Sequence, residues 1–86
     1  MKVATLLEIS SPESAVEHRQ PHREYLDQLK AKGKLAASGA FEDRSGALLI
    51  YEVESLEEAE QLLAADPFTK EGVFVKKLMK VWEQRN

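Results

Sequence analysis

The chain has 86 residues and a formal net charge of −3 at pH 7, with 12 basic and 15 acidic side chains. That balance argues against a nucleic-acid-binding protein, because phosphate binding needs a clustered positive surface. The absence of cysteine excludes disulfides and thiolate metal sites, and two histidines leave little material for a zinc site. We therefore expect one domain over residues 1–86, with a modest core and no bound metal.

A cytoplasmic homodimer is the default expectation for such a chain. No apolar stretch reaches the roughly 20 residues that span a bilayer, and the N-terminal segment turns acidic too early for a secretory signal. A chain of this size buries only about 60 to 65% of its unfolded surface, and oligomerisation is a common way to extend a small core. We expect no membrane partner and no nucleic-acid partner.

The first segments show a strand and then a helix. Lys2–Ile9 is expected to be a strand, with Val3, Thr5, Leu7 and Ile9 on one face and Ala4, Leu6 and Glu8 on the other. Residues 13–20 are polar and predict a loop or a ragged helical turn. Proline is tolerated in the first turn of a helix, so the regular helix is expected to begin near Gln20 or Pro21 and to end at about Lys32. A helix that begins earlier would have to bend at the proline.

Two more strands are expected in the middle of the chain. Lys34–Phe41 favours a strand, although its alanines could extend the helix, because Gly33 and Gly39 interrupt that alternative. Glu42–Gly46 is polar, ends in glycine and predicts a hairpin turn. Ala47–Val53 is apolar on both sides, which indicates a strand that is covered on both faces.

The last third of the chain begins with a capping box. In Ser55–Glu58 the serine can cap a helix while the glutamate reaches back, and the apolar spacing carries that helix to near Ala65. Asp66, followed by proline, predicts a short helical turn to about Glu71. Val73–Glu83 also fits a helix by its aromatic spacing, but its β-branched residues and alternating lysines favour a strand.

The order β-α-β-β-α-β is that of a ferredoxin-like split βαβ fold, of the α+β class. It predicts an antiparallel sheet with helices on one face. Pairing two such sheets through their other faces would form a dimeric α/β barrel. The large aromatic side chains are expected in the core: Tyr51, Phe68, Phe74 and Trp82.

His22 is the first candidate site residue. Helical spacing puts it on one face with Leu26 and Leu29, so its imidazole should point toward the interior or a cleft. A histidine can take or give a proton near neutral pH. The alternative is a histidine at the edge of the core, bonded to a backbone carbonyl. Arg19, one turn earlier, could hold an anionic substrate or be a solvated charge.

Asp66 has two possible roles. Aspartate before proline is a helix cap and needs no other function. As a carboxylate it could instead orient the imidazole of His22, as in acid–base pairs. Ser38 and Gly39 could place donors near such a pocket, although a plain strand also accounts for them. No phosphate-binding glycine loop, nucleophile elbow or metal-ligand cluster occurs.

The chain resembles the YciI-like (YCII-related) family through an ordered set of short motifs. These are Arg19-x-x-His22-x-x-x-Leu26, Gly33-Lys34-Leu35-x-x-Ser38-Gly39, Ser55-Leu56-Glu57-Glu58-Ala59 and Asp66-Pro67-Phe68 followed by Gly72-Val73. The resemblance implies a dimeric ferredoxin-like α/β barrel with a pocket around the histidine and the aspartate, and with Arg19 and the Ser38-Gly39 turn nearby. Many relatives follow that glycine with proline, where this chain has Ala40.

The resemblance also implies a class of function, since similar barrels host dehydrochlorination, lactone isomerisation and cofactor-free oxygenation. We therefore expect a small enzyme without a cofactor, of lyase or isomerase type, acting on a small anionic or cyclic metabolite. His22 would be the acid or base and Asp66 its partner. The alternative is a dimeric module that binds a small ligand, or assists another protein, without catalysis. A purely structural domain would have no cavity at this place.

Overall fold

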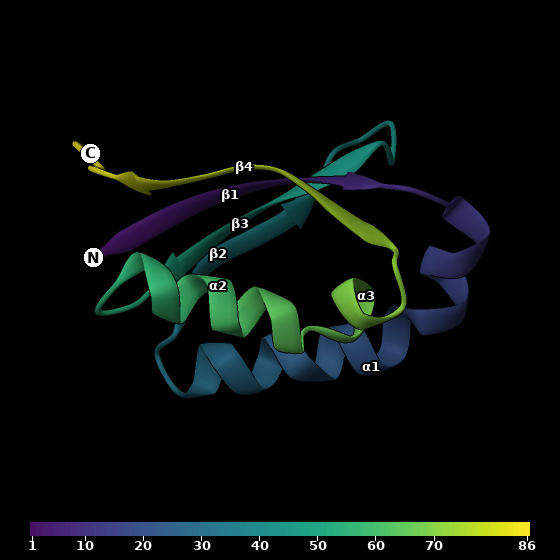
Figure 1. Cartoon of the computed structure of the whole chain (residues 1–86), viewed down its shortest axis with the longest axis horizontal. Helices are drawn as coiled ribbons and strands as arrows, with labels where there is room; N and C mark the ends of the chain where they lie inside the picture. Colours follow the sequence, from purple (N-terminus) through teal and green to yellow (C-terminus); the bar gives the residue numbers. More distant parts are fainter.

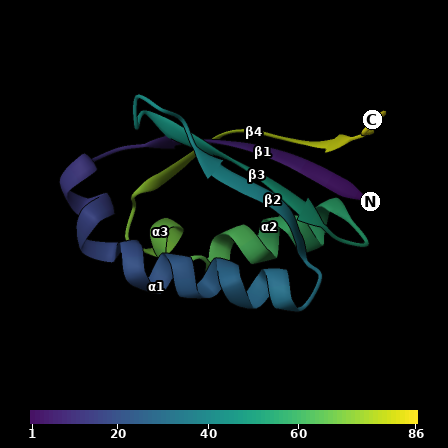
Figure 2. The same ribbon diagram turned by 180° about the vertical axis from the view of Figure 1, so that it is seen from behind.

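The computed structural model describes residues 1–86. The four strands form one antiparallel sheet in the order β2-β3-β1-β4. Figure 1 shows the helices on one side of this sheet, and Figure 2 shows the same layers from behind. The elements are β1 (Lys2–Ile9), α1 (Pro12–Ala31), β2 (Leu35–Ala40), β3 (Gly46–Glu52), α2 (Leu56–Ala65), α3 (Pro67–Lys70) and β4 (Phe74–Trp82).

Helix α1 begins earlier than the sequence predicts. Ser11 is its N-cap and accepts a hydrogen bond from the Ser14 N–H at 3.3 Å, with Pro12 in the first turn. Residues 13–20 are therefore helical, and the expected start near Gln20 or Pro21 is wrong. Pro21 lies inside the helix, and Figure 1 shows the first turns at an angle to the rest. A bend is what a proline inside a helix produces, because it lacks an N–H and its ring crowds the preceding turn.

The core lies between the sheet and the helices. Alternate residues of the two central strands point to the helices and are almost fully buried: Val3, Leu7, Leu49 and Tyr51. The helices cover them with Leu29 of α1, Ala59 and Leu63 of α2, and Phe68 of α3. This burial holds α1 against the sheet. No helix is both long and apolar enough to cross a lipid bilayer.

Strand β4 contains an irregularity that changes which side chains face the helices. Its register against β1 shifts between the pairs Leu6↔Leu78 and Leu7↔Lys76, so one extra residue is inserted. A one-residue insertion moves all later side chains to the opposite face. Phe74 therefore points to the helices and is 6% exposed, whereas Trp82 lies on the open face and is 42% exposed. The prediction that Trp82 belongs to the core is wrong for this reason.

The face of the sheet that the helices leave open is partly apolar. Leu48 and Leu78 are 41% and 43% exposed there, beside Trp82. Leu48 pairs with Leu6 across the sheet, and Leu78 pairs with the same residue from the other side. Leu48, Leu6 and Leu78 therefore form a continuous apolar strip across β3, β1 and β4.

Candidate functional site

His22 is held on the buried side of α1. The three buried residues of this helix, Ala15, His22 and Leu29, are seven positions apart, which is about two helical turns. They form one stripe that faces the sheet. The imidazole is thus placed by the same packing that buries the leucine, and the residue is only 8% exposed.

Asp66 joins α2 to α3 and is completely buried. Its Oδ1 accepts a hydrogen bond from the Phe68 N–H at 2.9 Å, which caps α3, and lies 2.7 Å from His22 Nδ1. One oxygen therefore serves both contacts, so the cap and the contact with the imidazole coexist. The other oxygen, Oδ2, has no hydrogen-bond partner in the chain.

This contact determines the orientation of the imidazole. An ionised carboxylate only accepts hydrogen bonds, so His22 Nδ1 must carry the hydrogen that it donates to Asp66. In the neutral ring, Nε2 is then the atom with a free lone pair. Because His22 also lines a cavity, this arrangement supplies a proton acceptor at the cavity wall.

Two phenylalanines fix the plane of the ring. The imidazole stacks on Phe68 with ring centroids 3.8 Å apart and an angle of 4° between the planes. Phe74 meets it edge to face at 5.2 Å, and the two phenylalanines are themselves 5.0 Å apart, edge to face. Phe68 thus contacts both members of the pair, with its backbone to Asp66 and its ring to His22.

Two tyrosines lie behind Asp66. The pKa of Tyr51 is raised strongly, first by burial and then by the negative charge of Asp66, and the pKa of Tyr25 is raised by the same two causes. Tyr25 donates its hydroxyl to the Leu62 carbonyl at 2.7 Å, while the Tyr51 hydroxyl is buried without a partner. Both hydroxyls therefore stay protonated near neutral pH, and Asp66 is the negative group of this region.

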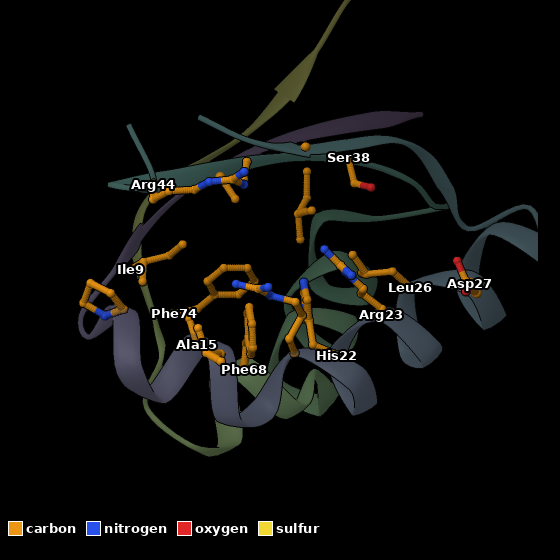
Figure 3. A pocket seen from close by; sticks show the side chains of 17 residues that line it. Ile9, Ala15, His22, Arg23, Leu26, Asp27, Ser38, Arg44, Phe68 and Phe74 are labelled. Atoms are coloured by element: carbon orange, nitrogen blue, oxygen red, sulfur yellow. The ribbon is translucent and has the colours of Figure 1, made fainter. Parts of the chain in front are cut away.

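The cavity lies between α1 and the sheet and has a volume of about 660 Å³. The side chains that Figure 3 labels come from β1, α1, β2, the loop before β3, α3 and β4. Among the predicted site residues, Arg19, His22, Ser38 and Gly39 line it, while Asp66 lies behind the imidazole and does not reach it. Ser38 is opposite the buried Leu49 in the sheet, which turns it toward the helices.

Among the lining residues that sequence reasoning did not assign to the site are two arginines and two phenylalanines: Arg23, Arg44, Phe68 and Phe74. Arg23 follows Arg19 by four positions, so helical spacing could have found it. The two phenylalanines were expected only as core. Arg44 belongs to the loop after β2, and no local pattern indicates where a loop side chain will point. No group of three or more potential metal-ligating side chains comes together in the structure.

The comparison with protein families matches almost the whole chain. Residues 1–83 fit the sequence model of the YCII-related domain. A stretch of 56 residues is 41% identical to the uncharacterized protein YjpA of Bacillus subtilis (strain 168), and it covers 65% of this chain and 66% of YjpA. The match therefore spans just under two thirds of that relative.

A solved structure is similar over its whole length. It is 5-chloro-2-hydroxyhydroquinone dehydrochlorinase (TftG) from Burkholderia phenoliruptrix AC1100, in complex with 2,5-dihydroxybenzoquinone. The TM-score is 0.81 at 27% sequence identity, and the match covers 99% of this chain and 96% of the TftG chain. The expected YCII family and the ferredoxin-like α+β fold are thereby confirmed.

Proposed function

We propose, since this chain belongs to the YCII-related family, that it is a small enzyme of lyase or isomerase type that acts on a small anionic or cyclic metabolite. His22 is its general acid or base, and Asp66 is the partner that orients the imidazole. The reaction needs no cofactor, because proton transfer requires only a placed acid or base.

One observation carries this proposal. His22 Nδ1 lies 2.7 Å from a fully buried carboxylate, while the same ring borders a cavity of about 660 Å³. A ligand-binding cavity in proteins has about 300 to 1,000 Å³, so this one is large enough for a small metabolite. A histidine that was only structural would not need both a buried carboxylate behind it and open space in front.

The proposed step is a proton transfer at Nε2. The unprotonated Nε2 takes a proton from an acidic C–H or O–H of the ligand, and the electron pair of that bond stays on the ligand. The imidazolium that forms is stabilised by the Asp66 carboxylate on the other nitrogen. An isomerase then returns the proton to another atom of the ligand. In a lyase, the electron pair left by the proton forms a new double bond, and the leaving group departs with the electron pair of its own bond to the ligand.

The other predicted site residues suit the negative charge that develops on the ligand. Arg19 lines the cavity one helical turn before His22 and can bind an anionic group. Ser38 and Gly39 line the opposite wall, on β2, where a hydroxyl and a backbone group face the ligand space. We propose that these three residues bind and position the substrate.

The neighbour TftG supports this class of reaction. Its name describes a dehydrochlorinase, and its structure contains a small quinone. Removal of hydrogen chloride takes a proton from one atom and chloride from another, so it uses a base of the kind proposed for His22.

Chloride release from 5-chloro-2-hydroxyhydroquinone tests the proposal. We expect His22→Gln to lower the rate by about 10² to 10⁴, because one placed acid or base contributes that much. The matched control is His18→Gln, since the other histidine does not line the cavity and only approaches Glu71 at 3.9 Å. Binding of 2,5-dihydroxybenzoquinone without chloride release that depends on His22 would instead support the non-catalytic binding module.

We also propose that the open face of the sheet pairs with a second copy of the chain. Leu48, Leu78 and Trp82 are exposed on this face, and a second sheet would bury them without any contribution from the helices. Light scattering should give twice the chain mass of 9.7 kDa. Leu48→Glu should give monomers, while Leu56→Glu, on α2, should not. A monomeric wild type would contradict this assembly.

A further inference from the structure

Beyond Arg19, the cavity holds two more arginines that the proposed chemistry does not use, Arg23 and Arg44. Three of the four arginines of the chain line it, Arg19, Arg23 and Arg44, against one carboxylate, Asp27. None of the three arginines takes part in an ion pair. This concentration is notable because the chain as a whole carries a net charge of −3. Uncompensated arginines around a cavity indicate a ligand with negative charge.

The acidic residues next to these arginines are engaged elsewhere. Asp43, which precedes Arg44, accepts hydrogen bonds from the Ser45 backbone at 3.0 Å and from the Ser45 hydroxyl at 2.7 Å. Glu24, which follows Arg23, accepts one from Gln20 at 3.3 Å. Neither carboxylate therefore pairs with the adjacent guanidinium group, and Asp27, one helical turn after Arg23, forms no ion pair with it either.

Arg44 also has an unusual backbone. Its φ of +65° is the only positive value at a residue other than glycine. Such a conformation is costly for a side chain with a Cβ, and glycine would adopt it freely. The loop fixes it, because the Arg44 N–H donates to the Phe41 carbonyl at 2.9 Å and Phe41 in turn donates to Gly46. Because glycine would adopt this φ without cost, the backbone alone does not account for an arginine at this position.

Figure 3 shows Arg44 extending along the sheet side of the cavity, while Arg23 rises from α1 on the other side. The lining also includes aromatic and apolar side chains, among them Phe68, Phe74 and Leu49. A ligand that matches both parts has a flat apolar ring and an acidic group attached to it. Arginine binds a carboxylate with two parallel hydrogen bonds, which suits this geometry.

We propose that Arg23 and Arg44 form a carboxylate-binding subsite, so that the ligand of this cavity is a ring acid rather than a neutral ring compound. The ring lies toward the imidazole and the phenylalanines, and the carboxylate lies between the two guanidinium groups. This inference rests on the proposed function for the position of the ring beside His22. It goes beyond that function in naming the second group that the substrate carries.

Binding measurements with two related compounds test the subsite. 2,5-Dihydroxybenzoate and hydroquinone have the same ring and differ in the carboxylate. We expect the wild type to bind the benzoate at least about tenfold more tightly, since a charged bidentate contact contributes about that factor. Arg44→Gly and Arg23→Gln should each remove most of this preference. Arg85→Gln is the matched control, because it removes the arginine that does not line the cavity and should keep the preference.

The outcomes separate this inference from the proposed function. His22→Gln should keep the preference for the benzoate while it removes turnover, so a failure of catalysis leaves the subsite intact. Equal binding of the two compounds by the wild type, or no binding of either, overturns the subsite. The subsite is also overturned if Arg85→Gln loses as much of the preference for the benzoate as Arg44→Gly and Arg23→Gln do, since net charge alone would then explain the loss. Inorganic phosphate that binds as tightly as the benzoate overturns the ring part of the inference.

Discussion

The inner wall of the cavity and its rim are built in opposite ways. On the inner wall, His22 contacts Asp66 and two phenylalanine rings, and every one of these groups is more than nine-tenths buried. On the rim, Arg23 and Arg44 are exposed and take part in no ion pair. The imidazole of the inner wall is therefore already oriented without a ligand, whereas the arginines of the rim have no partner of opposite charge, which a ligand could supply.

Replacing an aspartate by alanine should destabilise the protein much more at the inner wall than at the rim, and this is the largest difference that we expect. Asp66→Ala removes a buried carboxylate that contacts His22 and caps α3, and we expect it to lower the free energy of unfolding by about 3 to 5 kcal/mol. Asp27→Ala, on the exposed rim, should change it by less than about 0.5 kcal/mol. Urea denaturation measures both. Equal losses of unfolding free energy in the two variants would mean that the contact between His22 and Asp66 does not stabilise the inner wall.

Asp66→Asn separates the charge from the shape of the inner wall. The amide oxygen can still cap α3, because asparagine is a good N-cap, but it no longer stabilises an imidazolium. We expect a stability loss smaller than that of Asp66→Ala, together with a fall in turnover of about 10² or more. The ¹⁵N chemical shifts of the imidazole nitrogens report which one carries the hydrogen. Unchanged turnover would remove Asp66 from the proposed mechanism.

The next largest effect should come from the anchor of the rim loop. A Cβ on Gly46 would lie 2.2 Å from the Leu7 carbonyl oxygen, which is backbone and cannot move aside easily. We expect Gly46→Ala to lower the free energy of unfolding by about 2 kcal/mol. Gly39→Ala is the control, since nothing lies within 4 Å of its added Cβ. Urea denaturation measures both variants. A similarly small loss of unfolding free energy in both would show that the backbone around Gly46 can shift to accommodate the added Cβ.

Arg44→Gly should have a small effect of the opposite sign. Glycine adopts the φ of +65° freely, so we expect the free energy of unfolding to rise by about 1 kcal/mol or less. Thermal unfolding measures it, with Arg85→Gly as the control for charge removal. A clear loss of stability in Arg44→Gly would mean that the Arg44 side chain stabilises the fold. Arg44 would then not be a residue that serves the ligand alone.

An ion pair outside both regions should give the smallest effect, and one that depends on pH. The Glu54 N–H and Lys34 lower the pKa of the Glu58 carboxyl, whose Oε2 lies 2.7 Å from Lys34 Nζ. A lowered folded-state pKa adds stability above the unfolded value of about 4.3, and this is lost as the pH falls through the folded value. Glu58→Gln should therefore lower Tm slightly at pH 7 and not in strong acid. A difference that persists in acid would contradict this cause.

Features that depend on neighbouring residues could be predicted from the sequence. The cap at Ser55 and the short helix after Asp66 are examples, because a cap is a hydrogen bond between residues two or three apart. The start of α1 was missed because the helix was expected to begin at the proline, although Ser11 is an N-cap by the same chemistry. At Ser55, Asp66 and Ser11 alike, the residues that form the cap are close together in the sequence.

Features that depend on distant residues could not be predicted in this way. His22 and Asp66 are 44 positions apart, and no spacing rule brings them together. The residue types alone left their pairing as one of two possible roles for Asp66, and the family resemblance then implied a shared pocket. The extra residue in β4 that exposes Trp82 arises from its pairing with β1 and leaves no mark in its own sequence. The direction in which the Arg44 side chain points depends on the conformation of the whole loop between β2 and β3, and no short sequence pattern determines it.

The stacking of His22 on Phe68 has a consequence for the stereochemistry of the proposed reaction. The ring is clamped at 3.8 Å and Nδ1 is turned toward a buried carboxylate, so the imidazole cannot flip between two acceptor positions. A proton that enters at Nε2 must leave from Nε2. An isomerisation carried out here would therefore be suprafacial, with the hydrogen removed from and returned to the same side of the substrate plane.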